Sequence, residues 1–159
     1  LFNIKNEMVP FVNQEISIQR IAEDNYCKEG DMIFADASED LNDVGKSIEV
    51  VNLNNEKVLS GLHTILARPS EGTFSIGFTG YLSKSNSIRI QIQKEAQGSK
   101  VLSISAGRLS GISISFPCLE EQTKIANFLS SIDEKINHTV KQIQQTESWK
   151  KGLLRKMIM

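Results

Sequence analysis

The chain has 159 residues, a formal net charge of −1 and a hydrophobic fraction of 40%. This length predicts one globular domain of about 100–150 residues with an additional segment. The sequence shows neither a run of about 18 apolar residues nor a basic leader followed by an apolar stretch, so we expect no membrane span and no secretory signal. The two cysteines, Cys27 and Cys118, lie far apart, which favours reduced thiols in a cytoplasmic protein over a disulfide framework.

Charge is distributed unevenly along the chain. Residues 1–67 carry five Lys or Arg against twelve Asp or Glu, residues 68–118 carry six against two, and residues 119–159 carry seven against five. A basic middle segment beside an acidic start is compatible with a local positive surface, and ordinary surface charge explains the pattern equally well.

Short strands and turns are predicted in the first part of the chain. Alternating polarity favours a strand over residues 14–23, and the apolar run at 32–35 predicts a short buried strand. Residues 36–47 are rich in Asp, Asn and Ser and end in Gly-Lys-Ser, which is typical of a loop.

A hairpin and a further strand are predicted next. Residues 48–61 form two apolar runs separated by Asn54 and Asn55, a pair suited to a turn. Residues 63–69 are predicted as a strand that Pro69 stops.

The apolar period changes in the middle of the chain. Residues 74–98 fit one face of a helix, and Gly98 suits the position after a helix C-terminus. Residues 100–105 and 111–116 are predicted as strands that flank a short turn or helix at 105–110. Strands, a helix, more strands and a final helix indicate a strand-rich α+β domain rather than an alternating α/β fold.

The end of the chain is patterned as one long helix. Pro117 cannot continue a strand ladder, Glu120 and Glu121 suit the positive pole of a helix, and basic residues collect near the other end. No proline interrupts residues 118–159, so about 38 residues of helix would extend roughly 57 Å.

A heptad register places an apolar stripe along this helix. Burial of its six apolar a and d side chains, with Val140 alongside them, would contribute at most about 9–18 kcal/mol, at 1.5–3 kcal/mol for each side chain, whereas intrinsic propensity alone leaves such a helix marginal. We therefore expect a partner helix in a coiled coil, and the alternative is that the helix folds back onto its own domain. The predicted partner-facing residues are Leu129, Ile132, Ile136, Val140, Ile143, Leu153 and Met157.

Motifs for catalysis or metal binding are incomplete. Gly-Lys-Ser at 45–47 lacks the earlier glycine of a phosphate loop, because Asp40 stands there. A calcium loop also fails, since Leu41 replaces its glycine and Ser47 its bidentate glutamate. A nuclease site on the acidic residues around Asp36 lacks a Glu-x-Lys on a following strand. We predict no catalytic residue, no metal site and no cofactor.

A resemblance to a known family begins at residue 116. The run FPCLEEQTKIANFLSSIDEKI resembles the segment that opens each central helix in the DNA-specificity subunit of type I restriction-modification systems. Residues 28–38, 43–47, 101–117 and 150–157 also resemble segments of that family in order and spacing. The matching residues of the opening segment are Pro117, Glu121, Gln122, Ile125, Ala126, Phe128, Leu129, Asp133 and Ile136.

The resemblance implies a division of the chain and a role. In that family a full subunit carries two target recognition domains and two long helices packed antiparallel as a spacer. We expect a DNA target recognition domain at 1–117 and a spacer or dimerisation helix at 118–159. Since the chain holds one of each, we expect a C-terminal half, or a half-length subunit that pairs with another copy. The start at Leu1 rather than Met leads us to expect that the sequence is cut from a longer chain.

The expected partners follow from the same resemblance. They are double-stranded DNA, a methyltransferase (modification) subunit, a restriction (motor-nuclease) subunit, and a second specificity half or a second copy of the chain. The chain would read one half of a bipartite site without catalysing a reaction. The alternative is a structural coiled-coil oligomerisation module with a protein-binding domain.

The polar loops carry residue types that contact DNA. Lys and Arg neutralise phosphates, while Asn, Gln, Ser and Arg reach base edges. Ordinary surface groups would show the same residue types, so each position is a candidate only. The candidates are Asn42, Lys46 and Ser47; Lys84, Ser85, Asn86 and Arg89; and Lys100, Ser103, Ser105 and Arg108.

Overall fold

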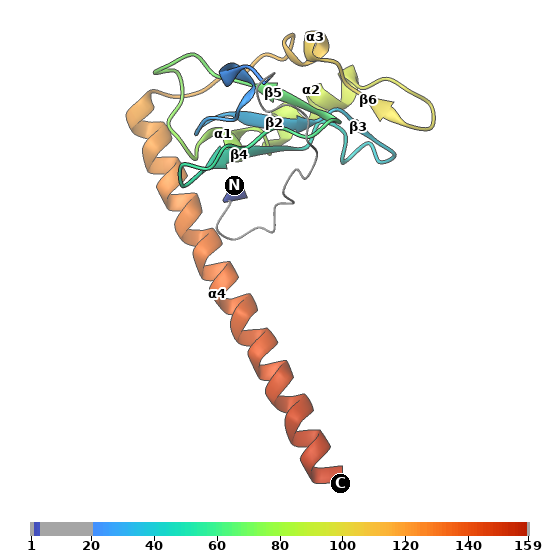
Figure 1. The fold of residues 1–159 in the computed structure, drawn as a ribbon, viewed down its shortest axis with the longest axis vertical. Helices are drawn as coiled ribbons and strands as arrows, with labels where there is room; N and C mark the ends of the chain where they lie inside the picture. Colours follow the sequence, from blue (N-terminus) through green and yellow to red (C-terminus); the bar gives the residue numbers. More distant parts are fainter. Residues whose placement is uncertain (1, 4–20, 159) are drawn as a thin grey trace. The chain divides into compact units, whose positions relative to one another are not determined.

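The computed structural model describes residues 2–3 and 21–158 (Figure 1). The chain divides into two compact units, Leu1–Ala126 and Asn127–Met159, which are described separately. The first unit contains short strands and helices, and the second belongs to a long helix. This composition confirms the predicted α+β class.

The first unit is built on a small sheet with the strand order β1-β4-β2-β5. The two central strands and β5 pair antiparallel, so that Met32 lies opposite Glu49 on one side and Ala67 on the other. A second sheet joins two short strands, β3 and β6, also antiparallel. The strands are β1 (Phe2–Asn3), β2 (Met32–Ala35), β3 (Ala37–Ser38), β4 (Ser47–Val51), β5 (Thr64–Ala67) and β6 (Leu102–Ser103).

Apolar side chains cover both faces of the main sheet, because successive residues of a strand point to opposite faces. Phe34 and Ile65 pack against one cluster of buried residues, namely Val44, Ile88, Ile92 and Ile104. Ile33 and Leu66 pack against the other, formed by Cys27, Val50 and Leu53. The sheet therefore lies between two small cores.

The predicted middle helix is two helices in the structure. Ser85 has extended backbone angles (φ −62°, ψ 145°), which separates α1 from α2. Gly98 lies beyond the end of α2 with φ 137°, where an added Cβ would lie 1.9 Å from the carbonyl oxygen of Val101. The helices are η2 (Glu23–Asn25), α1 (Thr79–Leu82), α2 (Asn86–Glu95), α3 (Ala106–Leu109) and α4 (Leu119–Ile158).

The strand predictions are partly confirmed. The strands expected at 32–35 and 63–69 appear as β2 and β5. Of the strand expected at 14–23, residues 14–20 lie outside the described residues, and a 3-10 helix begins at Glu23. The loop expected at 36–47 contains the two-residue strand β3 and the start of β4.

The predicted hairpin at 48–61 is wrong. Strand β4 pairs with β2 and β1 instead, and 57–61 contributes a single bridge between Leu59 and Tyr26. Asn52, Asn54 and Asn55 all have positive φ angles (55°, 54° and 63°), which turns the chain away from the strand that precedes them.

The predicted strand at 111–116 is also wrong, and the strand at 100–105 shortens to β6. Here a side chain from α2 takes the place of a partner strand. The Gln91 amide donates from Nε2 to the Ser113 carbonyl oxygen (3.0 Å) and accepts from the Ser113 N–H at Oε1 (3.0 Å). Both polar groups of that backbone position are satisfied without a ladder.

A buried ion pair joins the start of β2 to the end of β5. Asp31, which is 1% exposed, accepts hydrogen bonds from Arg68 Nε (2.9 Å) and Nη2 (2.7 Å). The Arg68 guanidinium also donates to the carbonyl oxygens of Asp24 and Tyr26. These bonds to Asp31 raise the pKa of Arg68 above its ordinary value, so this end of the sheet is held by a charged cross-link.

Helix α4 runs without a break through 40 residues, as the sequence predicts. Acidic Glu120 and Glu121 occupy its first turn and basic Arg155 and Lys156 its last. No helix in the described ranges is both long enough and apolar enough to cross a bilayer.

Candidate nucleic-acid interface

A hollow of about 560 Å³ brings together part of the first two groups of candidate residues, namely Lys46, Ser47, Lys84 and Arg89, while Asn42, Ser85 and Asn86 do not line it. It is bounded by the ends of β2, β4 and β5 on one side and by the link between α1 and α2 on the other. Three cationic side chains and no carboxylate line it. The lining residues are Ile33, Ala35, Lys46, Ser47, Ile48, Thr64, Ser83, Lys84 and Arg89.

Lys46, which lines this hollow, ends a turn at 39–46, hereafter the 39–46 turn. Asp40 organises it: its carboxylate accepts from the Asn42 N–H (2.8 Å), and its carbonyl oxygen accepts from the N–H groups of Asp43 (2.9 Å) and Val44 (3.1 Å). Such bonds from an Asp to the following backbone are the ordinary reason that Asp nucleates turns. The Asp-rich segment is therefore a structured turn.

Gly45 lets this turn approach α2. Its φ is +63°, and an added Cβ would lie 2.5 Å from Cγ2 of Ile92, a fully buried residue of α2. The preceding Val44 is also fully buried. The Gly-Lys-Ser sequence therefore reflects close packing of a turn on a helix.

Two side chains of α2 hold the backbone of the same turn. Arg89 donates from Nη2 to the carbonyl oxygens of Asn42 (3.1 Å) and Val44 (2.8 Å). Gln93 donates from Nε2 to the Leu41 carbonyl oxygen (3.4 Å) and to Oδ1 of Asn42 (3.3 Å). Arg89 thus positions the turn, a role that the sequence did not predict when it indicated Arg89 as a candidate DNA contact.

Three cationic side chains determine the electrostatics of the hollow, and they differ in burial and in ion pairing. Burial lowers the pKa of the Arg89 guanidinium, and the carboxylate of Asp43 partly offsets that effect. Nη1 of Arg89 is buried and has no hydrogen-bond partner among the described residues. Lys46 pairs with Asp43, whereas Lys84 is exposed and makes no ion pair within the described part of the chain. Lys84 is accordingly available to an anion, whereas the unpaired Nη1 of Arg89 lies buried.

Ser85 and Asn86 continue from Lys84 into the first turn of α2. Ser85 is the residue before the helix, its side chain makes no capping bond to the backbone, and its hydroxyl lies 3.3 Å from that of Ser87. Asn86 is exposed. These side chains have polar groups that the fold leaves free for other contacts.

The third candidate group lies elsewhere, beside the C-terminal end of α2. Arg108 of α3 donates from Nη1 to the carbonyl oxygen (3.3 Å) and to Oε2 (3.2 Å) of Glu95. Ser105 caps α3 by accepting from the Arg108 N–H, and Ser103 donates to the Gln97 carbonyl oxygen. Lys100 is exposed in the turn before β6. This group does not line the hollow.

Several residues of the hollow were not predicted from the sequence. Thr64 and Ser83 line it, and Gln93 supports its wall, but each lies in a segment whose pattern indicated only a strand or a helix. Their position depends on β5 and α1 meeting at the same edge, and no local sequence signal encodes that meeting.

The acidic residues in the described part of the chain do not gather into a metal centre. The carboxylate of Asp31 is occupied by Arg68 and by the Lys28 N–H (2.7 Å). Within the described ranges, no three His, Cys, Asp or Glu side chains are placed to share a metal ion.

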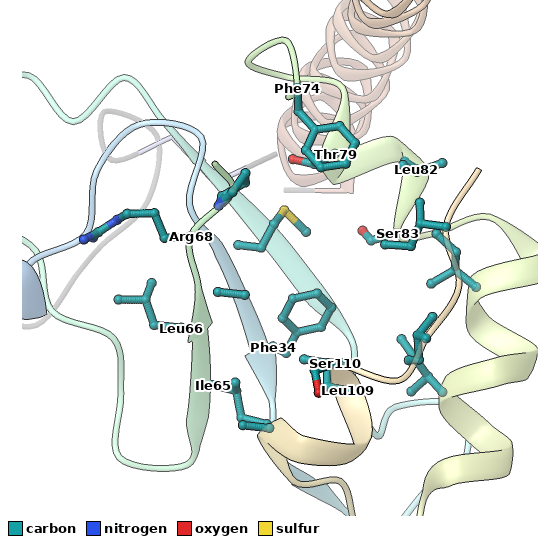
Figure 2. A pocket seen from close by; sticks show the side chains of 18 residues that line it. Phe34, Ile65, Leu66, Arg68, Phe74, Thr79, Leu82, Ser83, Leu109 and Ser110 are labelled. Carbon is teal, nitrogen blue, oxygen red and sulfur yellow. The ribbon is translucent and has the colours of Figure 1, made fainter. Parts of the chain in front are cut away.

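A second cavity, of about 330 Å³, lies between the sheet and the helices (Figure 2). Phe34 and Ile65 approach it from the strands, Leu82 from α1 and Leu109 from α3. Thr79 also lines it, and its buried hydroxyl has no hydrogen-bond partner among the described residues. Its walls are almost entirely apolar, which suits it to the packing of the core and not to a phosphate.

The comparison with known proteins decides the family. Residues 3–147 match the type I restriction modification DNA specificity domain. The chain belongs to this family. A protein of Methanocaldococcus jannaschii named as a type I restriction enzyme MjaX specificity subunit is 30% identical over 131 residues. The alignment covers 80% of this chain and 30% of that relative, so the chain spans less than a third of the relative's length.

Membership of the DNA specificity domain family confirms the resemblance seen in the sequence. The matched range includes all three candidate groups and the N-terminal part of α4. The class of the specificity domain is therefore settled, while its individual contact residues stay predictions.

Proposed function

We propose that this specificity domain reads one half of a bipartite DNA site. Residues 1–117 would form the target recognition domain and residues 118–159 the spacer helix of a type I restriction-modification enzyme. The observation that carries the proposal is the match to the DNA specificity domain over residues 3–147.

The hollow is the proposed anchor for the DNA backbone. Lys84 has no competing anion among the described residues, Lys46 has only one, and the lining contains no carboxylate to repel a phosphate. Cations of this kind position a protein on DNA without reading its sequence. Asn42, Ser47 and Asn86, at or beside the hollow, are the proposed base-reading side chains, since amides and hydroxyls can pair with base edges.

The group at the other end of α2 is proposed as a second contact surface. Lys100 supplies an exposed cation there, and Arg108 can exchange Glu95 for a phosphate only by breaking an existing ion pair. We therefore expect Arg108 to contribute less to affinity than Lys84.

Helix α4 is proposed to pair with a second helix, from another specificity half or a second copy of the chain. Aliphatic residues of its stripe are half exposed in the single chain: Ile136 and Ile143 are each 54% exposed. Residues 119–138 carry two Lys or Arg against four Asp or Glu, and residues 139–158 carry five against one. An antiparallel arrangement would place the acidic half of one helix against the basic half of the other.

The paired helices would set the distance between two recognition domains. A helix of 40 residues extends about 60 Å, whereas one turn of duplex DNA rises about 34–36 Å. The assembled subunit would position a methyltransferase subunit and, through it, a motor-nuclease subunit in the cytoplasm. The chain itself supplies recognition rather than chemistry.

DNA affinity measured across a salt series tests this proposal. A DNA-binding protein loses affinity as the salt concentration rises. The slope of log K against the logarithm of the salt concentration is about −0.9 for each phosphate contacted. Lys84→Ala should lower the magnitude of that slope by about one contact. Lys94→Ala is the matched control, because Lys94 lies on α2, is exposed and does not line the hollow.

Two results would contradict the proposal at different points. Absence of binding by the wild-type chain to any duplex would favour the structural oligomerisation module. Equal slopes for the Lys84 and Lys94 variants would show that the hollow does not hold the backbone.

A further inference from the structure

Gln122, in the first turn of α4, is a buried polar side chain that makes three hydrogen bonds. It is 1% exposed. Its Oε1 accepts from the Ser75 N–H (2.9 Å), and its Nε2 donates to the carbonyl oxygens of Pro117 (2.9 Å) and Thr73 (3.3 Å). The amide thus joins the start of α4 to a segment more than forty residues earlier in the chain.

Ser75 makes the same junction from the opposite side. Its hydroxyl donates to the Leu119 carbonyl oxygen (3.1 Å) and lies 2.8 Å from Oγ1 of Thr123. Ala126, one turn further along α4, is 4% exposed, and an added Cβ at Gly77 would lie 3.8 Å from its Cβ. The first two turns of α4 therefore pack closely on residues 73–77.

A buried carboxylate fixes residues 73–80 to the sheet. Glu49 of β4 is 1% exposed, and its two oxygens accept from the N–H groups of Gly77 (2.6 Å) and Gly80 (2.7 Å). The contacts form a continuous path from the central sheet through Glu49 to residues 73–80, and from there through Gln122 to α4. The side-chain oxygens of Glu49 and the amide of Gln122 are all hydrogen-bonded on this path, and satisfied buried polar groups of this kind make a network rigid.

We propose that Gln122 is the positioning residue that makes the spacing between DNA half-sites specific. The inference rests on the proposed function, in which two recognition domains read DNA at a distance set by paired helices. Helix α4 is continuous from Leu119 to Ile158, so a change in how its first two turns are held is passed along the rest of the helix. Gln122 contributes to spacing because it fastens those turns to the domain that reads the bases.

Only an amide can satisfy this position. The site requires one acceptor for the Ser75 N–H and a donor for two carbonyl oxygens. Glutamate retains the acceptor but loses the donor, and alanine loses both. Gln122→Ala and Gln122→Glu therefore both remove the donor, the first by deleting the side chain and the second by placing a carboxylate against two carbonyl oxygens. Gln145→Ala is the matched control, since Gln145 is an exposed residue of α4 beyond the first unit.

The test is selection of duplexes from a randomised library by the purified full chain, followed by sequencing. The wild type and the Gln145→Ala control should enrich one bipartite motif with a single spacer length. Gln122→Ala and Gln122→Glu should each enrich the same half-site motifs with several spacer lengths. Amide hydrogen exchange at Ser75 reports whether the contact is lost while the rest of the domain stays folded.

The outcomes separate this inference from the proposed function. A wild type that enriches no motif, or only a single half-site, overturns the proposed function and this inference with it. A wild type with one spacer length, and a Gln122→Ala variant that loses Ser75 protection but keeps that same length, overturns the inference alone. A variant that unfolds is replaced by Gln122→Glu, for which an unchanged spacer length has the same meaning.

Discussion

At the scale of single residues, the role of Gly45 could not be predicted from the sequence. Gly-Lys-Ser at 45–47 is part of the pattern of a phosphate loop, but Asp40 occupies the position of the required earlier glycine. The structure shows why a glycine is nevertheless present: Gly45 has a positive φ and lies against Ile92. Neither condition is visible in a single sequence, because both arise from a turn that meets α2.

Gly45→Ala should destabilise the domain. A left-handed backbone costs a residue with a Cβ about 1–2 kcal/mol, and crowding in a packed core costs about 1–3 kcal/mol more. We expect the free energy of unfolding to fall by about 2–5 kcal/mol in urea denaturation.

Gly72→Ala is the control for this measurement. Gly72 has a similar φ of +73° but no heavy atom within 4 Å of an added Cβ, so only the backbone cost of about 1–2 kcal/mol applies. Equal losses for the two variants would mean that the 39–46 turn does not pack on Ile92.

At the scale of elements, the sequence predicts a helix or strand correctly where the signals that define it lie within the element itself. Helix α4 has acidic residues at its start, basic residues at its end and no proline within it, and it forms as predicted. The strand prediction at 111–116 was wrong because alternating polarity indicates an extended chain and does not indicate whether another strand pairs with it. The partner there is the Gln91 side chain, and a single amide leaves no periodic signal.

The stripe of α4 allows a test of how it pairs. A strict heptad places Leu153 in the seam and Leu154 outside it, whereas in a straight helix of 3.6 residues per turn Leu154 aligns with Ile136 and Ile143. If α4 forms a left-handed coiled coil, Leu153→Asp should abolish pairing in sedimentation experiments and Leu154→Asp should largely preserve it. The two residues are similarly exposed in the single chain, at 38% and 48%, so each serves as the other's control.

The reverse order of effects would contradict the heptad register. It would indicate a straight packing of helices in which Leu154 faces the partner. Unchanged mass for both variants, and for Ile136→Asp combined with Ile143→Asp, would show that this stripe does not hold two chains together.

At the scale of the whole molecule, the recognition-domain boundary expected at 117 stays a prediction, because a compact unit need not coincide with a recognition domain. The first compact unit extends through Ala126. Gln122 contributes to this, since its bonds join the start of α4 to Thr73 and Ser75. Proline and charge mark where a helix begins, but contacts decide which body it belongs to.

Truncation after residue 126 or after residue 117 tests that boundary. The longer fragment retains both cores and the Gln122 bonds, so it should unfold cooperatively with near-complete stability. The shorter fragment loses three hydrogen bonds of Gln122, worth about 0.5–1.5 kcal/mol each. We expect its free energy of unfolding to be about 1.5–4.5 kcal/mol lower in chemical denaturation. Equal stabilities would place the boundary at 117 after all.

Helix α2 has a consequence for redesign. Arg89 and Gln93 hold residues 41–44, Gln91 holds Ser113, and Glu95 holds Arg108. One short helix thus holds three separate exposed segments in place. We expect that replacing the 39–46 turn by a turn of another sequence would change the DNA sequence that the protein binds and would leave the fold intact, provided that the new turn keeps a small apolar residue at 44 and glycine at 45. Substitutions of the α2 side chains that make these contacts would disturb all three segments together.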